Sequence, residues 1–206
     1  MLDYFSGAVR VSLVTFALCG FAYPLAVTAA AQLLMPYRAN GSLEQGADGR
    51  IIGSRLIGQA WSDPQWFHGR PSATVAADAK DPGKTVDAPY NAANTTASNL
   101  GPTSKALQDR LAADRKALEA VQPELAGKLL PADMLTTSAS GLDPDISPAN
   151  AALQATRVAR ARDVDPARVA ALVEQHVMVR SLGIFGEPRV NVLELNLALE
   201  KAFPKK

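Results

Sequence analysis

The sequence predicts an α+β protein, mostly α, in which one N-terminal transmembrane helix precedes a single globular domain with a small β-sheet. Three observations lead to this fold class. The stretch from Val11 to Tyr37 contains no charged residue, and a helix needs about 20 apolar residues to cross a bilayer core. Short β-branched runs between glycines follow this stretch. The second half of the chain then shows apolar residues at helical spacing.

The N-terminal segment is predicted to divide into a cytoplasmic tail, residues 1–10, and a transmembrane helix, residues 11–35. Pro24 lacks a backbone donor and is predicted to kink this helix, which membrane helices tolerate. A cleaved signal peptide is the alternative, because Ala29–Ala31 form an A-x-A site. The apolar run continues past that site to Met35, which favours a retained anchor. The simplest topology then leaves the N-terminus in the cytoplasm and the domain outside it.

The globular domain is predicted to span residues 36–206, beginning with a linker over about 36–49. Glycines flank β-branched residues between Arg50 and Gly58, which predicts one or two short strands. Residues 61–101 follow as a long irregular region in which aromatic residues stand among Pro, Gly, Asn and Asp. Loops of this length in compact domains are usually functional or are folded on their own side chains.

Start signals predict helices in the second half of the chain. Ser147 and Asp165 each stand before a proline, the pattern of an N-cap followed by proline at the first helical position. Asn191, with Glu194 three residues later, resembles a capping box. The predicted helices cover residues 102–121, 148–162, 166 to the glycines at 183 and 186, and 192 to the end.

Charge balance and cysteine content exclude several classes of protein. The chain has 21 Lys and Arg against 20 Asp and Glu, whereas a nucleic-acid-binding protein needs a basic face. Cys19 is the single cysteine, which excludes an intramolecular disulfide and a thiol-rich metal site. We therefore expect no nucleic-acid partner and no metal site.

Catalytic constellations are weak in this sequence. Its two histidines, His68 and His176, lie far apart, and His176 falls on the apolar face of a predicted helix, where a hydrogen-bonded core position is expected. The segment 138–141 lacks the leading glycine of a nucleophile elbow. A membrane-anchored serine hydrolase that uses Ser138 or Ser140 is the alternative function. Outside this alternative, we predict no catalytic residue in the chain.

One stretch resembles a nucleotide-binding motif. Ser138, Ser140 and Gly141 form a turn, and Gln154 and Arg157 follow on a predicted helix. ATP-binding cassette ATPases place a Ser-Gly-Gly-Gln turn before a similar helix, where backbone N–H groups face a phosphate. Here the glutamine is displaced along the chain, and no G-x-x-x-x-G-K-[ST] loop is present. These five residues are candidates for nucleotide affinity, and a capped turn before a surface helix is the competing interpretation.

Six blocks of sequence resemble the C subunit of the bacterial Kdp potassium-transporting ATPase. They cover nearly the whole chain in the right order, behind one N-terminal anchor. The blocks are GSRLIGQ from Gly53, WFHGRPSA from Trp66, YN with SNLGPT from Tyr90 and Ser98, SGLDPDISP from Ser140, QATRVA from Gln154, and GEPRVNVLELN from Gly186. Ala97 and Ala139 stand where the family commonly has glycine, and Asp145 stands where it has histidine. Ala139 weakens the argument for a flexible phosphate-binding turn.

The resemblance implies a non-catalytic accessory subunit of a high-affinity potassium uptake complex, in a single-pass arrangement in the bacterial inner membrane. In that complex a channel-like subunit selects potassium, and a P-type ATPase subunit is phosphorylated by ATP. The C subunit promotes assembly and raises the ATPase subunit's affinity for ATP. We therefore expect those two subunits and membrane lipid as partners, with ATP, K⁺ and Mg²⁺ used by the complex and no cofactor held by this chain alone.

A domain outside the cytoplasm meets almost no ATP, so the predicted topology favours coupling through the anchor over direct nucleotide contact. In such a complex the aromatic loop, which contains Trp61, Trp66 and Phe67, serves either as a contact surface or as a cover for the domain's own core. The candidates for partner contact are Trp61, Trp66, Phe67, Arg70, Asn99 and Asp143.

Overall fold

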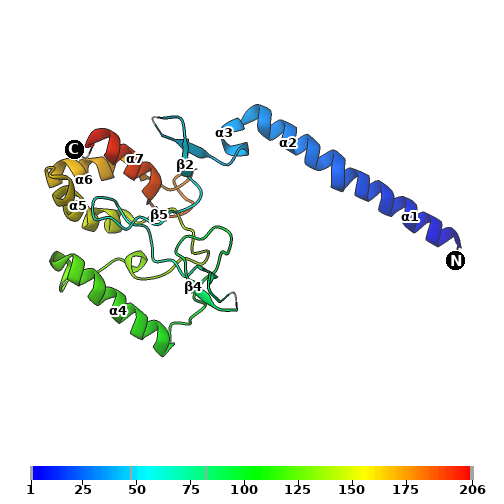
Figure 1. Cartoon of the computed structure of the whole chain (residues 1–206). Helices are drawn as coiled ribbons and strands as arrows, with labels where there is room; N and C mark the ends of the chain where they lie inside the picture. The colour runs from blue at the N-terminus through cyan, green and yellow to red at the C-terminus, as the bar shows by residue number, and fades with distance from the viewer. Residues whose placement is uncertain (1, 47, 82, 205–206) are drawn as a thin grey trace. The chain divides into compact units, whose positions relative to one another are not determined.

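The computed structural model describes residues 2–46, 48–81 and 83–204, and it confirms the predicted fold class (Figure 1). Helices predominate, and the strands are short and form three small sheets within this described part. The chain divides into two compact units, Met1–Ser54 and Arg55–Lys206. The first unit therefore includes a short hairpin in addition to the apolar helix.

One long apolar helix makes up most of the first unit. It consists of α1 (Leu2–Ala17), a π-helical turn η1 (Leu18–Ala22) and α2 (Tyr23–Leu34). Among the described residues, Tyr4–Leu34 is the one stretch long and apolar enough to cross a membrane; its best 18-residue window has a mean hydropathy of 1.8 and contains no buried residue. The predicted span over residues 11–35 corresponds to the C-terminal part of this helix.

The π-helical turn lies directly before Pro24. Proline has no N–H, and its ring clashes with the carbonyl four residues earlier, which is that of Gly20 here. A single π turn widens the backbone at such a point, and it is a known form of bulge within α-helices. The disturbance predicted at Pro24 thus takes the form of a local change in helical winding.

A four-residue helix and a hairpin complete the first unit. Helix α3 (Pro36–Ala39) is followed by β1 (Leu43–Gln45) and β2 (Ile51–Ser54), which pair antiparallel with an irregularity at Gln45. Strand β2 confirms the prediction of a strand after Arg50. Its partner β1 lies in the predicted linker and was not predicted.

The core of the second unit forms between three helices and a three-stranded antiparallel sheet of order β5-β7-β6. Core side chains that are 0% exposed include Val158, Val169, Val190, Leu195 and Leu199. The elements are α5 (Pro148–Arg162), α6 (Pro166–Gln175), α7 (Val192–Ala202), β5 (Asp145–Ile146), β6 (Val177–Met178) and β7 (Arg189–Asn191).

The predicted helix starts are confirmed, and one predicted helix end is wrong. Ser147, Asp165 and Asn191 each accept a hydrogen bond from a backbone N–H in the first turn of the helix that follows. Helix α6 was expected to run to the glycines at 183 and 186 but ends at Gln175. Residues 177–178 pair with β7 instead, because ladder hydrogen bonds to a neighbouring strand override local helical periodicity.

The remaining elements of the second unit are peripheral. Strands β3 (Val75–Ala77) and β4 (Thr85–Asp87) form a hairpin inside the region predicted to be irregular. Helix α4 (Lys105–Val121) confirms the helix predicted over 102–121, starting three residues later. Two short 3₁₀ turns follow it, η2 (Pro123–Leu125) and η3 (Ala132–Met134).

Two buried amide side chains hold the irregular segment against the helices. Asn196 is 0% exposed; its Oδ1 accepts from the N–H of Phe67 at 2.8 Å, and its Nδ2 donates to the Phe67 carbonyl at 2.9 Å. Gln154 makes the same pair of bonds to the backbone of His68, at 2.8 and 3.0 Å. Each amide thus satisfies the polar backbone groups as a neighbouring strand would, which allows Phe67 to enter the core.

We predict that Asn196→Ala lowers the free energy of unfolding by about 2 to 4 kcal/mol, because it leaves a buried N–H and a buried C=O unpaired. Chemical unfolding of the full chain in detergent measures this loss. Asn94→Ala is the matched control, since Asn94 is exposed and makes one bond to the Val75 carbonyl; its cost should stay below about 1 kcal/mol. Equal losses for the two variants would contradict the assignment.

Candidate functional site

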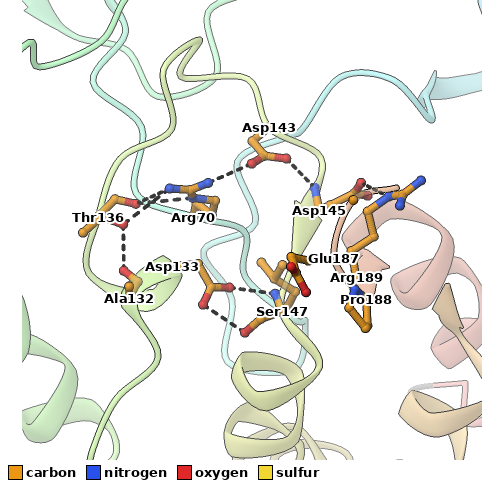
Figure 2. Close-up of a pocket in the computed structure, with 12 residues that line it drawn as sticks. Arg70, Ala132, Asp133, Thr136, Asp143, Asp145, Ser147, Glu187, Pro188 and Arg189 are labelled. Atoms are coloured by element: carbon orange, nitrogen blue, oxygen red, sulfur yellow. Dashed lines mark hydrogen bonds and ion pairs between the residues drawn. The ribbon is translucent and has the colours of Figure 1, made fainter. Parts of the chain in front are cut away.

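A polar pocket of about 530 Å³ lies among Arg70 and the segments 132–136, 143–147 and 186–189 (Figure 2). The three segments come from the turn η3, the strand β5 and the approach to β7. Several lining residues form ion pairs close to the start of α5. Two of the lining residues, Arg70 and Asp143, are among those predicted for partner contact.

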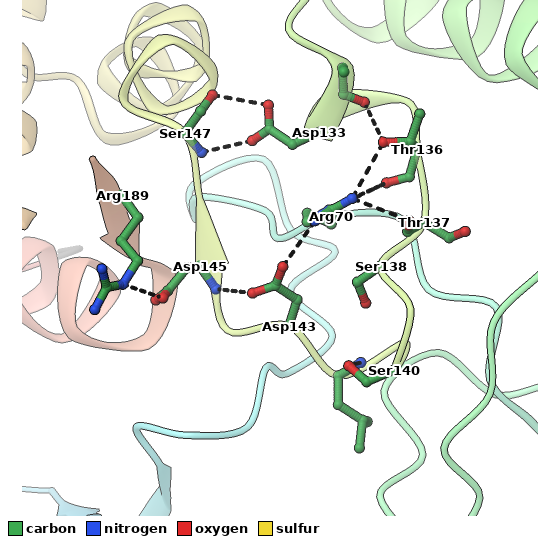
Figure 3. Close-up of polar contacts among 12 residues, drawn as sticks. Arg70, Asp133, Thr136, Thr137, Ser138, Ser140, Asp143, Asp145, Ser147 and Arg189 are labelled. Carbon is green, nitrogen blue, oxygen red and sulfur yellow. Dashed lines mark hydrogen bonds and ion pairs between the residues drawn. The ribbon is translucent and has the colours of Figure 1, made fainter. Parts of the chain in front are cut away.

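Arg70 connects the aromatic loop to the segment before β5. Its Nη1 forms an ion pair with Asp143 at 3.0 Å, and its Nη2 donates to the carbonyl of Thr137 at 3.1 Å (Figure 3). A longer contact of 3.4 Å reaches the carbonyl of Thr136. Both charged side chains are half-buried. The two candidates for partner contact therefore bind each other, and one guanidinium group bridges two irregular segments.

Tyr90 fixes the backbone at the same place. Its hydroxyl donates to the Arg70 carbonyl at 2.7 Å. The ring lies against Gly58 so closely that a Cβ there would be 2.5 Å from it, which explains why this position has no side chain. Burial raises the pKa of Tyr90 to about 12, and the nearby charge of Asp143 contributes. The hydroxyl is thus a permanent donor at physiological pH.

The N-terminus of α5 binds a carboxylate of the chain itself. Asp133 accepts from the backbone N–H of Ser147 at 2.7 Å, from the Ser147 hydroxyl at 2.9 Å and from Asn150 Nδ2 at 2.9 Å. A helix N-terminus attracts anions through its free N–H groups and its dipole. Asp133 therefore holds the N-cap residue of α5 and the Asn150 side chain in place.

The other charges around the pocket are also paired. Asp145 forms an ion pair with Arg189 at 2.9 Å, and Glu187 pairs with Arg180 at 2.6 Å. Among the described residues there is no group of three His, Cys, Asp or Glu side chains that could hold a metal ion. The lining of the pocket thus carries four carboxylates, Asp133, Asp143, Asp145 and Glu187, against two arginines, Arg70 and Arg189, so acidic groups are in excess.

Three of the nucleotide candidates lie together in one packed turn. Ser138 is 6% exposed and accepts from the N–H of Gly141 at 2.9 Å, while the Ser140 hydroxyl accepts from the N–H of Leu142 at 3.1 Å. Gly141 has a φ of 71°, and a Cβ there would meet the Thr74 side chain at 2.5 Å. The two N–H groups of this turn already have partners within it.

The other two nucleotide candidates, Gln154 and Arg157, lie on α5 and hydrogen-bond to each other and to groups outside the turn. Arg157 Nη2 donates to Gln154 Oε1 at 2.7 Å, its Nε donates to Gln122, and its Nη1 donates to the carbonyl of Pro64. Gln154 also holds the backbone of His68. Burial lowers the pKa of Arg157 to about 10. The direct role of all five residues in nucleotide affinity stays a prediction.

The aromatic loop packs mainly on the core of its own unit. Phe67 is 0% exposed, so its side chain offers no surface to a partner. Trp61 and Trp66 are half-buried against the core, with ring centroids 5.1 Å apart, and the Arg162 guanidinium lies 4.3 Å from the Trp66 ring centroid. Asn99 is exposed and has a left-handed backbone, with a φ of 51°. Partner contact by the exposed edges of these residues stays a prediction.

Neither histidine contacts a candidate serine in the hydrogen-bond pattern of the described residues. The His68 ring lies 3.1 Å from the carbonyl of Asp63, and the His176 ring lies 2.8 Å from the carbonyl of Leu172. His176 is half-buried and hydrogen-bonded, close to the expected core position, although it ends α6 instead of continuing it. The arrangement therefore gives no support to the hydrolase alternative.

Several residues that build this site were missed from sequence. Asp133 lies outside all six family blocks and has no local motif, so nothing marked it. Tyr90 lies in one of the family blocks, but its local sequence indicates no role. A better signal existed for Asn196, which stands between Leu195 and Leu199 on the apolar face of a predicted helix. A polar residue at such a position must find a hydrogen-bond partner when it is buried.

We predict that protonation of His68 destabilises the fold. Burial lowers the pKa of His68 below its usual 6.5, and the positive charge of Arg157 lowers it further. Below pH 6.5 the unfolded chain binds a proton that the folded chain rejects, so stability should fall as the pH drops through this window. Urea unfolding at about pH 7.5 and about pH 5.5 should show a smaller difference for His68→Gln than for the unsubstituted chain. Equal differences would show that carboxylates alone cause the pH dependence.

Comparison with known proteins agrees with the resemblance. A family model described as "KdpC: K+-transporting ATPase, c chain" matches residues 5–201. A relative from Bradyrhizobium diazoefficiens, named potassium-transporting ATPase KdpC subunit, is 55% identical over 205 residues and covers 100% of both chains. Relatives of the same name from Rhodopseudomonas palustris and Methylorubrum extorquens are 54% and 53% identical. They match 98% and 97% of this chain, and 100% and 97% of their own lengths. The chain therefore belongs to the KdpC family of potassium-transporting ATPase subunits.

Proposed function

We propose that this chain is the non-catalytic accessory subunit of a high-affinity, ATP-driven potassium uptake complex. It promotes assembly of the complex and raises the affinity of the P-type ATPase subunit for ATP. The observation that carries the proposal is the family match over residues 5–201, since a match of this length includes the apolar helix and the globular unit together. Its partners are that ATPase subunit and the channel-like subunit that binds potassium.

The apolar helix supports a role within a membrane complex. The most apolar 18-residue window of Tyr4–Leu34 contains no buried residue, which is consistent with a surface that faces lipid and partner helices. Gly20, Ala22 and Ala26 provide small side chains, which allow close approach of another membrane helix. We infer that the helix is a retained single-pass anchor in the inner membrane.

The proposed topology separates the globular unit from ATP. With the N-terminus in the cytoplasm, the unit Arg55–Lys206 lies on the outer side of the membrane, where it meets potassium and not nucleotide. An effect on ATP affinity then requires that this subunit favour one conformation of the ATPase subunit over another. The size of that effect equals the difference in its binding energy to the two conformations.

The hydrogen bonds of the nucleotide candidates support an indirect effect. Asp133 already occupies the N-terminus of α5, and Arg157 is buried among backbone and amide oxygens. The N–H groups of Gly141 and Leu142 are bonded within their own turn. These residues therefore act on the complex through the shape of the globular unit. Half-exposed side chains such as Arg70 and Asp143 are the ones that contact the partners.

Assembly and ATP affinity are testable in one preparation. We predict that the tagged full chain, expressed with the channel-like and ATPase subunits, retains both in detergent, and that omitting it raises the KM for ATP of the remaining complex. A chain truncated after Ser54 tests whether the first unit alone suffices. Purification of the tagged chain by itself would contradict the proposal. An unchanged KM would contradict only its ATP-affinity part.

The single cysteine permits a test of topology. In a Cys19→Ser background, we predict that Leu129→Cys reacts with a membrane-impermeant maleimide in intact spheroplasts, because Leu129 is 96% exposed on the globular unit. Labelling only after lysis would place this unit in the cytoplasm. N-terminal sequencing of the purified chain is the companion measurement, and Gln32 as first residue would show a cleaved signal peptide.

A further inference from the structure

A short apolar hairpin projects from the sheet between β6 and β7. It covers residues 179–185 and is called the 179–185 hairpin below. Four of its seven residues have large, apolar and mostly exposed side chains: Val179 at 76%, Leu182 at 88%, Ile184 at 71% and Phe185 at 63%. Soluble surfaces rarely gather such side chains without a binding role. The apolar anchor cannot account for them, because they belong to the globular unit.

The backbone of the 179–185 hairpin is held in one conformation without help from a core. Ser181 and Phe185 exchange two backbone hydrogen bonds, of 2.8 and 2.9 Å, and Gly183 donates to the carbonyl of Arg180 at 3.1 Å. The ion pair between Arg180 and Glu187 closes the base at 2.6 Å. The hairpin thus presents its side chains in a fixed arrangement, which reduces the entropy lost on binding.

Leu182 at the apex adopts a strained backbone. Its φ is 54°, in the left-handed region that Asn and Gly adopt far more readily than leucine. Strain of this kind is retained where the surroundings or a function require it. No packing within the chain offsets it, because the side chain is 88% exposed. A large apolar residue at this position is therefore explained better by contact with another molecule than by folding.

We propose that the 179–185 hairpin is a docking element, with Leu182 as its anchor, for an apolar groove on another protein subunit of the transport complex, outside the hydrocarbon. This inference rests on the proposed function for the existence of that complex. Charge decides between a protein and a lipid surface. Arg180 is offset by Glu187, and Arg189 by Asp145, whereas loops that bind anionic lipid carry unpaired basic residues.

The surroundings of the hairpin also fit a protein interface. Residues 186–189, which follow the hairpin directly in the chain, line the polar pocket, and Figure 2 labels Glu187, Pro188 and Arg189 among them. An apolar centre beside paired charges is the composition of a protein–protein contact. A few side chains in the centre of such a contact supply most of its binding energy. The four exposed apolar side chains of the hairpin correspond to such a centre, and the charged residues that line the pocket correspond to its polar rim.

Two variants separate docking from folding. Leu182→Asn removes the apolar side chain but suits the left-handed backbone, so its thermal unfolding should match or exceed that of the unsubstituted chain. Leu182→Asn with Phe185→Ser should weaken retention of the other subunits by the tagged full chain about tenfold or more. Leu129→Asn is the matched control, because Leu129 is equally apolar and 96% exposed elsewhere on the same unit; it should assemble normally.

The outcomes distinguish this inference from the proposed function. Normal assembly of the double variant, or an equal loss with Leu129→Asn, would overturn the docking role and leave the proposed function intact. Failure of the unsubstituted chain to retain any subunit would instead overturn the proposed function. A photo-crosslinking amino acid at position 182 of the full chain in its complex should form an adduct with another subunit. An adduct with lipid alone would overturn the assignment of a protein groove.

Discussion

The fold of the globular unit depends on side chains that satisfy the backbone of an irregular segment. The aromatic loop has no strand partner of its own, and its burial would leave several N–H and C=O groups without hydrogen bonds. Asn196 and Gln154 bond to Phe67 and His68, and Arg162 Nε donates to the Gln65 carbonyl at 3.0 Å. These three residues belong to α5 and α7, so helix packing and loop position are fixed together.

This arrangement explains why the sequence-based prediction of the fold succeeded in some places and failed in others. Helix starts such as Ser147 and Asn191 depend on contacts within one turn, so local sequence reveals them. The end of α6 depends on β7, which is distant in sequence, and the hairpin between β3 and β4 lies in a segment with no strand-like alternation. Long-range pairing of this kind leaves no signal in a local pattern.

The candidate site likewise contains residues that the sequence indicates and residues whose role depends on contacts distant in sequence. Arg70 and Asp143 were selected because they belong to family blocks, and they do form an ion pair. Asp133 could not be found in this way, since its role arises only when η3 approaches the start of α5. The turn at Ser138–Gly141 resembles a phosphate-binding motif in sequence. In this chain the N–H groups of Gly141 and Leu142 have partners within the turn, and the role of the turn in nucleotide affinity stays a prediction.

The π-helical turn before Pro24 affects how the anchor meets its neighbours. Such a turn contains about one residue more than an α-helical turn, which rotates the faces of α1 and α2 relative to each other by about 100°. Side chains that share a stripe on an ideal helical wheel therefore point in different directions on either side of Leu18–Ala22. In the proposed transmembrane arrangement, the two leaflets of the bilayer would accordingly meet different stripes of the same helix.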